Sequence, residues 1–387
     1  MTFSAESDSV ASHLNENDIS NLISSRLYRG FLKIVMKTWE KIKEDPSLLE
    51  KYFIREKVIN SVRSFFSNRM FHEVQTPILV PTPSCEANLE VFQTELKTFM
   101  GLKRKEFLIM SPEYSIKKLL SAGIGNCFEI TRCFRNDEEI SSSHNPEFTM
   151  LEWYRTNASY LDIMEDFERL FVKIVKDLNP KTDIAKWVYQ GRTYDISQPW
   201  TRITVSDAFD KYAGIDIDSL LSDKKLIKIA KKRGYKVDKQ TTWEETFYQL
   251  LFNEIEPSLN KTNKPYFLYD YPLSQASLSK KKVSDPRFAE RFEAFLAGIE
   301  LGNCFSELTD ANEQRVRFLK DLKARKKAGK IEVPIDNDLL KALSKSMPEV
   351  AGIAVGVDRL IMLAGNFSNI SDTLFFPARE IFDLPNT

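Results

Sequence analysis

The stretch from Thr131 to Arg155 carries the residues whose types and spacing are best suited to chemistry. Arg135 follows one apolar run, and an aromatic residue, Phe148, opens the next. A guanidinium can hold a phosphate or a carboxylate through two hydrogen bonds, and it keeps its charge at any working pH. An aromatic ring gives a nucleotide base a face on which to stack. The pattern suggests a site for a phosphate-bearing ligand, although a lone arginine near a turn is more often an ordinary surface charge.

Acidic residues form a second group with chemical potential. Two apolar strands expected within Arg291–Leu301 carry Glu293 and Glu300. If the turn between the strands is centred between Leu296 and Ala297, the two glutamates lie directly opposite each other on one face. Carboxylates about 5 Å apart repel each other unless a cation lies between them, and Mg²⁺ accepts carboxylate and polyphosphate oxygens together. The pair indicates a magnesium site or, as the plainer alternative, two glutamates on a solvated sheet face.

Two helix starts add further charged groups. Glu113 follows Ser111 and Pro112, which suit the N-cap and the first position of a helix. Arg359 stands where the strand Gly352–Gly356 enters another helix. Since the N-terminal end of a helix is positive, an arginine there can help to hold a terminal phosphate.

The elements that must position these residues follow from hydrophobic spacing. Thr131–Arg155 predicts an antiparallel hairpin whose polar loop is Asn136–Ser143. Apolar residues recurring every three or four positions predict amphipathic helices. The expected helices are Asp18–Asp45, Tyr52–Phe66, Leu161–Leu178, Val205–Tyr212 and Trp243–Ile255. Strands are expected at Met70–Val74, continuing into Thr76–Leu79, and at Leu108–Met110 and Phe267–Pro272.

The chain divides into three parts by composition. We expect residues 1–17 to be a disordered tail, 18–50 a helical extension and 51–387 one large domain of the α+β class. Within that domain, residues from about 160 to 262 are expected to be mostly helical and to cover one side of the rest. The basic amphipathic helix after the tail is expected to dock its apolar stripe on the domain.

The overall composition is that of an ordinary globular protein. Of 387 residues, 42% are hydrophobic and 28% are charged, the formal net charge is zero and the pI is about 6.9. A nucleic-acid binder usually has a basic excess, which this balance does not provide. The four cysteines lack CxxC spacing, which favours buried reduced thiols. No apolar run reaches about 18 residues, so we expect no membrane span and a cytoplasmic protein.

Three stretches together resemble the class II aminoacyl-tRNA synthetases in their lysyl-type form. Phe134–Asp137 with His144–Thr149 is similar to motif 2 of that family. Phe71–Leu79, with Pro77, resembles motif 1, and Gly352–Leu360 resembles motif 3. The order and near-correct spacing of the three make chance similarity a poor explanation. The resemblance implies an antiparallel sheet flanked by helices, and a homodimer formed through motif 1 and its preceding helix.

The resemblance also implies ATP and Mg²⁺ as cofactors and assigns a role to each matching residue. Adenylation needs charge neutralisation and positioning rather than proton transfer, and Arg135, Arg359 and Glu300 would be its catalytic residues. The nucleotide would be held by Arg135, His144, Asn145, Phe148, Glu300, Arg359 and either Asp137 or Glu138. The metal would be held by Glu293 and Glu300. The amino acid would be held by Glu113, Glu152, Tyr154, Asn303, Phe305, Glu307 and Ala354.

The sequence departs from the family pattern at three places. Eight residues separate Arg135 from His144 where the family has seven, so the acidic residue that contacts ATP is either Asp137 or Glu138. Ser143 stands where lysyl-tRNA synthetases commonly carry an arginine. Cys304 replaces the family glycine before Phe305, and its side chain is expected to affect the shape of the amino-acid pocket.

Within the family, residues from about 52 to 377 most resemble the elongation factor P–(R)-β-lysine ligases. The similarity extends to Ser274–Leu278, Leu308–Asp310 and Ala351–Ala354, where Ala354 stands in place of the glycine of lysyl-tRNA synthetases. The resemblance implies transfer of (R)-β-lysine, or lysine, to a lysine of elongation factor P. About 50 residues precede motif 1 and look helical, which makes tRNA an unlikely acceptor. A truncated lysyl-tRNA synthetase, another lysine-activating ligase and a non-enzymatic binding protein remain as alternatives.

Overall fold

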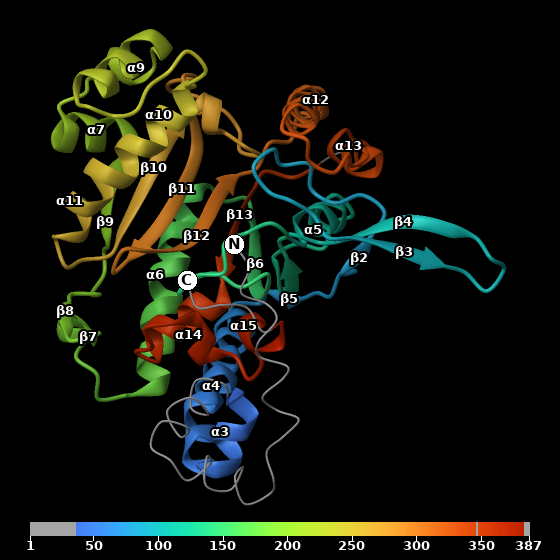
Figure 1. Cartoon of the computed structure of the whole chain (residues 1–387), viewed down its shortest axis with the longest axis vertical. Coiled ribbons are helices and arrows are strands. Elements are labelled where there is room, and N and C mark those ends of the chain that lie inside the picture. The colour runs from blue at the N-terminus through green and yellow to red at the C-terminus, as the bar shows by residue number, and fades with distance from the viewer. Residues whose placement is uncertain (1–35, 346, 383–387) are drawn as a thin grey trace, which may run out of the picture.

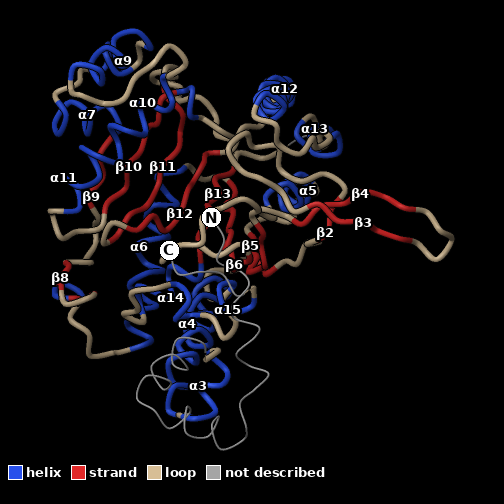
Figure 2. Tube along the Cα trace, in the orientation of Figure 1, coloured by secondary structure: helices blue, strands red, loops and turns tan. Residues whose placement is uncertain are grey.

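A computed structural model describes residues 36–345 and 347–382, and its centre is an eight-stranded sheet (Figures 1 and 2). The strand order is β1-β5-β6-β13-β12-β11-β10-β9. In chain order the strands are β1 (His72–Glu73), β5 (Cys127–Phe134), β6 (Glu147–Thr156), β9 (Thr201–Thr204), β10 (Tyr266–Pro272), β11 (Phe288–Leu296), β12 (Ile299–Ser306) and β13 (Val350–Gly356). The six central strands pair antiparallel, whereas β1 and β9 join the two edges in parallel. The expected α+β class is confirmed.

Three helices bury one face of this sheet (Figure 1). They are α4 (Leu49–Ser67), α6 (Tyr160–Leu178) and α14 (Val357–Ala364). Their apolar residues recur at helical spacing and pack on alternate residues of the strands, as the period of two in a strand requires. The helices expected at Tyr52–Phe66 and Leu161–Leu178 are confirmed by α4 and α6.

A second apolar core lies beside β10. It is formed by α7 (Val205–Ala213), α8 (Ile217–Leu220), α9 (Asp223–Lys232), α10 (Trp243–Leu250), the π-helical turn η3 (Leu251–Ile255) and α11 (Glu256–Asn260). The region is mostly helical, as expected. It also supplies β9 and a small two-stranded sheet, β7 (Trp187–Tyr189) with β8 (Arg192–Tyr194), which hydrophobic spacing did not indicate.

A three-stranded sheet projects from the body beside the helix α5 (Glu113–Ser121), as Figure 1 shows. Its strands are β2 (Leu79–Val80), β3 (Gln93–Lys97) and β4 (Lys103–Leu108). The strand expected from Met70 to Leu79 is much shorter, because β1 and β2 keep two residues each. Pro77 lies between the two strands, where its missing N–H would interrupt a ladder.

The described part of the N-terminal extension is the short helix α3 (Thr38–Glu44) and a 3₁₀ turn, Pro46–Leu48. Thr38 donates through its backbone N–H and its hydroxyl to the carboxylate of Glu380, at 2.6 and 2.8 Å. Glu380 belongs to α15 (Ala378–Ile381), so this part of the extension is fixed to the body. The expected tail at 1–17 and most of the helix expected from Asp18 lie outside the described residues.

The remaining described helices are α12 (Ala311–Lys327) and α13 (Asn337–Leu343), which pack with α5 around a third apolar cluster. All four cysteines are buried and free, as expected from their spacing.

Candidate active site

A cavity of about 390 Å³ opens on the face of the central sheet opposite the large helical core. Strand alternation explains its position: Asn303 and Phe305 line the cavity, whereas Cys304 between them is fully buried in the core. The Cys304 side chain therefore points away from the cavity. The cysteine therefore adds no atoms to the cavity wall, and its effect on the backbone at Phe305 stays a prediction.

Arg135 lies in one wall of the cavity, directly after β5. Its guanidinium carbon is 5.1 Å from the centre of the Phe148 ring, and Cys133 pairs with Phe148 across the hairpin. Glu138 also lines the cavity and lies 3.6 Å from Arg135, whereas Asp137 is exposed and has a φ of 53°. Of the two acidic residues that the sequence left open, the structure brings Glu138 into the site and leaves Asp137 outside.

His144 and Arg359 form a pair across the same cavity. A guanidinium nitrogen of Arg359 donates to Nε2 of His144 at 2.8 Å, and the hydroxyl of Ser141 lies 2.8 Å from Nδ1. Since arginine only donates, Nε2 must be unprotonated and Nδ1 must carry the proton. Burial lowers the pKa of His144, and the charge of Arg359 lowers it further. His144 is therefore held as a neutral acceptor beside the arginine.

The two glutamates expected to bind metal both line the cavity, but their register differs from the expectation. The turn is centred on Ala297 and Gly298, and a bulge follows Ala294. Glu293 therefore pairs with Asn303, and Glu300 lies opposite Phe295. The prediction that the glutamates face each other directly is wrong, because a turn one residue later and a bulge shift the strands.

The donor set at Glu293 and Glu300 fits Mg²⁺. Both are carboxylates, the side chain of Glu300 is 44% exposed, and the charge of Glu300 contributes to the raised pKa of Glu293, whose first cause is burial. In the described parts of the chain no group of three or more His, Cys, Asp or Glu residues gathers to hold a metal. Mg²⁺ suits such a partial set, because it commonly keeps water and takes phosphate oxygens as its other ligands.

Arg291 is a site residue that sequence reasoning missed. It is buried, and it donates to Glu293 at 2.5 Å, to Asn303 at 3.1 Å and to the backbone carbonyl of Gln275 at 2.5 Å. Tyr271 donates to the other carboxylate oxygen of Glu293 at 2.6 Å. Arg291 stands two residues before Glu293, so both side chains lie on one face of β11. This spacing in the sequence could have identified Arg291 as a site residue.

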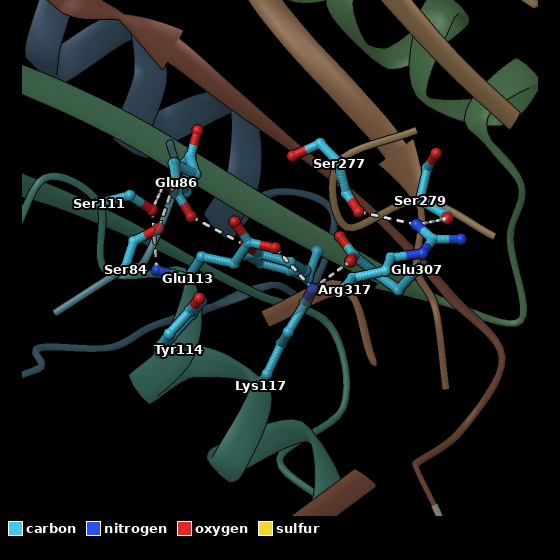
Figure 3. Close-up of polar contacts among 12 residues, drawn as sticks. Ser84, Glu86, Ser111, Glu113, Tyr114, Lys117, Ser277, Ser279, Glu307 and Arg317 are labelled. Atoms are coloured by element: carbon cyan, nitrogen blue, oxygen red, sulfur yellow. Dashed lines mark hydrogen bonds and ion pairs between the residues drawn. The ribbon is translucent and has the colours of Figure 1, made fainter. Parts of the chain in front are cut away.

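The far end of the site is a buried carboxylate cluster on α5, β6 and the end of β12. The ammonium of Lys117 lies 2.5 Å from Glu113 and 2.5 Å from Glu307, as Figure 3 shows. Glu152 accepts from the hydroxyl of Ser111 at 2.6 Å and from that of Tyr154 at 2.9 Å. Ser111 also accepts from the backbone N–H of Glu113 at 3.0 Å, so it caps α5 from one residue further out than expected, and Pro112 takes the N-cap position.

Burial changes the ionisation of this cluster. It raises the pKa of Glu152 to about 8, with a further contribution from the charge of Glu113. It also raises the pKa of Glu113 and that of Glu307, the latter to about 8, while Lys117 acts in the opposite direction on both. Burial lowers the pKa of Lys117, but the two glutamates outweigh this effect and raise it above its usual value.

The cavity gathers most of the residues that the sequence nominated. Those that line it are Glu113, Arg135, Glu138, His144, Asn145, Phe148, Glu293, Glu300, Asn303, Phe305, Ala354 and Arg359. Glu152, Tyr154 and Glu307 lie behind that lining, fully buried. Ala354 pairs with Asn303 on one side and with Glu152 on the other, so it joins the lining to the buried cluster.

The family model described as tRNA synthetases class II (D, K and N) matches residues 37–380. The chain belongs to this family. Its fold is accordingly the class II synthetase catalytic fold, and the stretches that resemble motifs 2 and 3 form the hairpin β5–β6 and the junction of β13 with α14.

Several similar curated proteins are lysine–tRNA ligases. One from Campylobacter jejuni is 37% identical over 327 residues, which is 84% of this chain and 63% of the relative. One from Dehalococcoides mccartyi is 36% identical over 330 residues, which is 85% of this chain and 64% of the relative. One from Thermoanaerobacter pseudethanolicus is 37% identical over 337 residues, which is 87% of this chain and 65% of the relative. The chain thus spans somewhat less than two thirds of the length of these relatives.

The class II motifs of this chain are also joined by a buried polar network. Asp358, next to Arg359, accepts from Arg55 of α4 and from the backbone N–H of Thr149 at 2.7 Å. Arg55 also donates to the hydroxyl of Thr149 at 3.2 Å. The network fixes motif 2 and motif 3 to the helix before motif 1.

None of the helices described is long and apolar enough to cross a membrane.

Proposed function

We propose that this protein is an ATP-dependent ligase that activates lysine or (R)-β-lysine as its adenylate. The observation that carries the proposal is the arrangement of charge in one site. Arg135, His144 and Arg359 line the cavity together with Glu113, and the buried carboxylates of Glu307 and Glu152 are linked to Glu113 through Lys117 and Ser111. Cationic groups suit phosphates and a substrate carboxylate, and buried carboxylates suit ammonium groups.

In the proposed step, a carboxylate oxygen of the amino acid attacks the α-phosphorus of ATP and forms a new O–P bond. The bond between the α-phosphorus and the oxygen that bridges to the β-phosphate breaks, and pyrophosphate leaves with that oxygen and the bonding electrons. No proton changes place, so the protein has to orient the reactants and neutralise charge. Arg135 is placed to hold the α-phosphate and the substrate carboxylate, with Phe148 as the surface for adenine. Arg359 would hold the outer phosphates, and neutral His144 would serve them by accepting from the Arg359 guanidinium and fixing its orientation.

Glu293 and Glu300 are the residues that would hold Mg²⁺, with Arg291 and Tyr271 fixing the orientation of the Glu293 carboxylate. When bound, the metal would neutralise charge on the phosphate oxygens of ATP. Glu113 and Asn303 would receive the amino and carboxylate groups, and Phe305 would lie against the alkyl stem. Glu152, Tyr154 and Glu307 would receive the distal ammonium.

For the second half-reaction we propose a lysine side chain of elongation factor P as the acceptor. The neutral acceptor amine attacks the adenylate carbonyl, an amide forms, the amine gives up a proton to solvent, and AMP leaves. The support is the local resemblance to elongation factor P–(R)-β-lysine ligases, above all Ala354 in the cavity wall. Because both the acceptor and the adenylate belong to translation, we place the reaction in the cytoplasm.

A second candidate is aminoacylation of tRNA, which the names of the similar lysine–tRNA ligases favour. The two functions differ in acceptor and can be separated directly. The purified protein is incubated with ATP, Mg²⁺ and radiolabelled lysine or (R)-β-lysine, and with either unmodified elongation factor P or lysine tRNA. We expect label on elongation factor P, lost when its acceptor lysine is replaced by arginine. Label on tRNA alone would establish the second candidate instead.

A further inference from the structure

Lys117 has no role in the proposed reaction, yet it lies at the centre of the amine end of the site. It follows Glu113 by four residues, so one turn of α5 places both side chains on the same face. Its side chain is 2% exposed, and its ammonium is shared between Glu113 and Glu307 at 2.5 Å each (Figure 3). A lysine buried to this degree is rare unless it is paired.

The surroundings of the pair are strongly acidic. Glu152 of β6 lies directly opposite Glu129 of β5, and both are buried. Glu152 accepts only from hydroxyl groups in the described residues, those of Ser111 and Tyr154. Glu86 before β3 also raises the pKa of Glu113. The thiols of Cys133 of β5 and Cys304 of β12 lie near the cluster, and their pKa values are raised by burial and further by Glu152 and Glu307 respectively.

We propose that Lys117 is a positioning residue whose ammonium serves as the internal counter-cation of the amine pocket, keeping Glu113 and Glu307 in place and favouring their charged forms before the substrate arrives. It touches these carboxylates and not the reacting atoms. The proposal rests on the proposed function, because it concerns how the pocket is prepared for an amino acid with two ammonium groups.

The chemistry follows from the cost of burying charge. Two buried carboxylates without a cation take up protons, because burial disfavours the charged form. A protonated carboxyl group binds an ammonium poorly, so each added proton must leave when the substrate binds. In this structure Lys117 lowers the pKa of both Glu113 and Glu307 against the rise caused by burial. Without Lys117, their pKa values rise further, and substrate binding becomes coupled to the release of more protons.

The test measures lysine binding by calorimetry as a function of pH, from about pH 6 to pH 8, in full-length wild type, Lys117→Met and Lys118→Met. Lys118 is the matched control, because it follows directly on α5 and pairs with Asp336 at 2.6 Å, outside the cluster. Titration of the ligand's own amines is common to all variants and cancels in the comparison.

We expect Lys117→Met to bind lysine about tenfold more weakly than wild type near neutral pH. As pH rises, the affinity of this variant relative to wild type should recover by up to about tenfold per pH unit. This steeper rise corresponds to about one additional proton released from Glu113, which calorimetry in two buffers of different ionisation enthalpy measures directly. Glu307 does not supply that proton, because burial raises its pKa to about 8 in wild type and it is already protonated over most of this pH range. Lys118→Met should follow wild type. Equal weakening of Lys117→Met at every pH would reduce Lys117 to a packing residue and overturn the proposal.

Because Lys117→Met removes one partner of a buried ion pair, that chain could fail to fold. A comparison of the single variant Glu307→Gln with the double variant Glu307→Gln/Lys117→Met keeps the test decisive. The double variant removes both partners of one ion pair and so leaves no unpaired charge at that contact. The double variant leaves Glu113 without its cation and should show the steeper pH dependence relative to Glu307→Gln alone. Identical slopes in the two would contradict the proposal.

Lysine binding by wild type distinguishes a failure of the Lys117 proposal from a failure of the proposed function. If wild type binds neither lysine nor (R)-β-lysine in the presence of ATP and Mg²⁺, the proposed function itself is wrong. If wild type binds and the slopes of the variants do not change, the function stands and only the role of Lys117 falls.

Discussion

At the scale of single residues, the same side chain takes different roles because its surroundings differ. Glu300 is half exposed at the edge of the cavity and is available to a metal. Glu113 and Glu307 are buried against Lys117, while Glu152 is buried against hydroxyl groups and has a pKa raised to about 8. The family resemblance nominated all four from the sequence, whereas their ionisation depends on the fold.

Glu300→Gln should lower ATP–pyrophosphate exchange by about 100-fold, because one carboxylate cannot keep the metal beside the phosphates. The melting temperature should stay close to that of wild type, since Glu300 is not buried. The control is Glu332→Gln, which removes a carboxylate that is 73% exposed and pairs with Lys326 on the surface. Exchange near the wild-type rate in Glu300→Gln would remove the metal assignment.

Ala354→Gly should change the choice between the two isomers of lysine. The Ala354 methyl lines the cavity between Asn303 and Glu152, where we expect it to crowd an α-amine more than a β-amine. One methyl group is worth about 1–3 kcal/mol, or about 10- to 200-fold, in discrimination. The kcat/KM ratio of α-lysine to (R)-β-lysine should rise by about that factor, and an unchanged ratio would exclude Ala354 as the selector.

At the scale of elements, sequence periodicity predicted the motif hairpin and the helices α4, α6, α7 and α10 well. It failed on the register of β11 and β12, because a turn and a bulge that depend on local backbone geometry shift Glu293 away from Glu300. It also failed on β9, whose four residues are only half buried at a sheet edge and show no clear alternation. Lys117 was missed because its second partner, Glu307, is far away in sequence.

Gly352→Ala should disturb the contact between β13 and the carboxylate cluster. A Cβ at this position would lie 2.3 Å and 2.4 Å from ring atoms of Tyr154 and 2.9 Å from a carboxylate oxygen of Glu307. We expect the free energy of unfolding to fall by about 1–3 kcal/mol relative to wild type. The KM for lysine should rise more than the KM for ATP, each compared with its wild-type value.

The matched control for this change is Gly356→Ala in the same strand, where the nearest atom to an added Cβ lies at 3.6 Å on Arg359. Denaturant unfolding should separate the two variants, with Gly356→Ala the more stable. Equal stability in both would mean that the Tyr154 ring is not fixed as described.

At the scale of the whole molecule, the helix α4 and the segment after it carry exposed apolar residues. Phe53 is 40% exposed, Met70 85%, Ile78 37% and Leu79 41%. A surface of this kind on the motif 1 region fits the homodimer that the family resemblance implies, and the sequence had pointed to the same region from its motif alone.

We therefore expect wild type to be a dimer by light scattering at micromolar concentration, and Leu79→Glu to shift it towards the monomer. Val283→Glu is the control, because Val283 is 89% exposed but lies away from this region of the chain. A wild-type monomer, or equal dissociation in both variants, would contradict the assignment of this surface.

The central claim is that the cavity adenylates an amino acid with two ammonium groups, and amino-acid-dependent ATP–pyrophosphate exchange tests it most directly. The family model covers synthetases for aspartate, lysine and asparagine, so these amino acids and (R)-β-lysine form the panel. The buried carboxylates Glu113, Glu152 and Glu307 would repel the side chain of aspartate and offer nothing specific to asparagine. We predict Mg²⁺-dependent exchange with lysine or (R)-β-lysine and none above background with the other two. Exchange with aspartate or asparagine, or no exchange with either lysine isomer, would contradict this account.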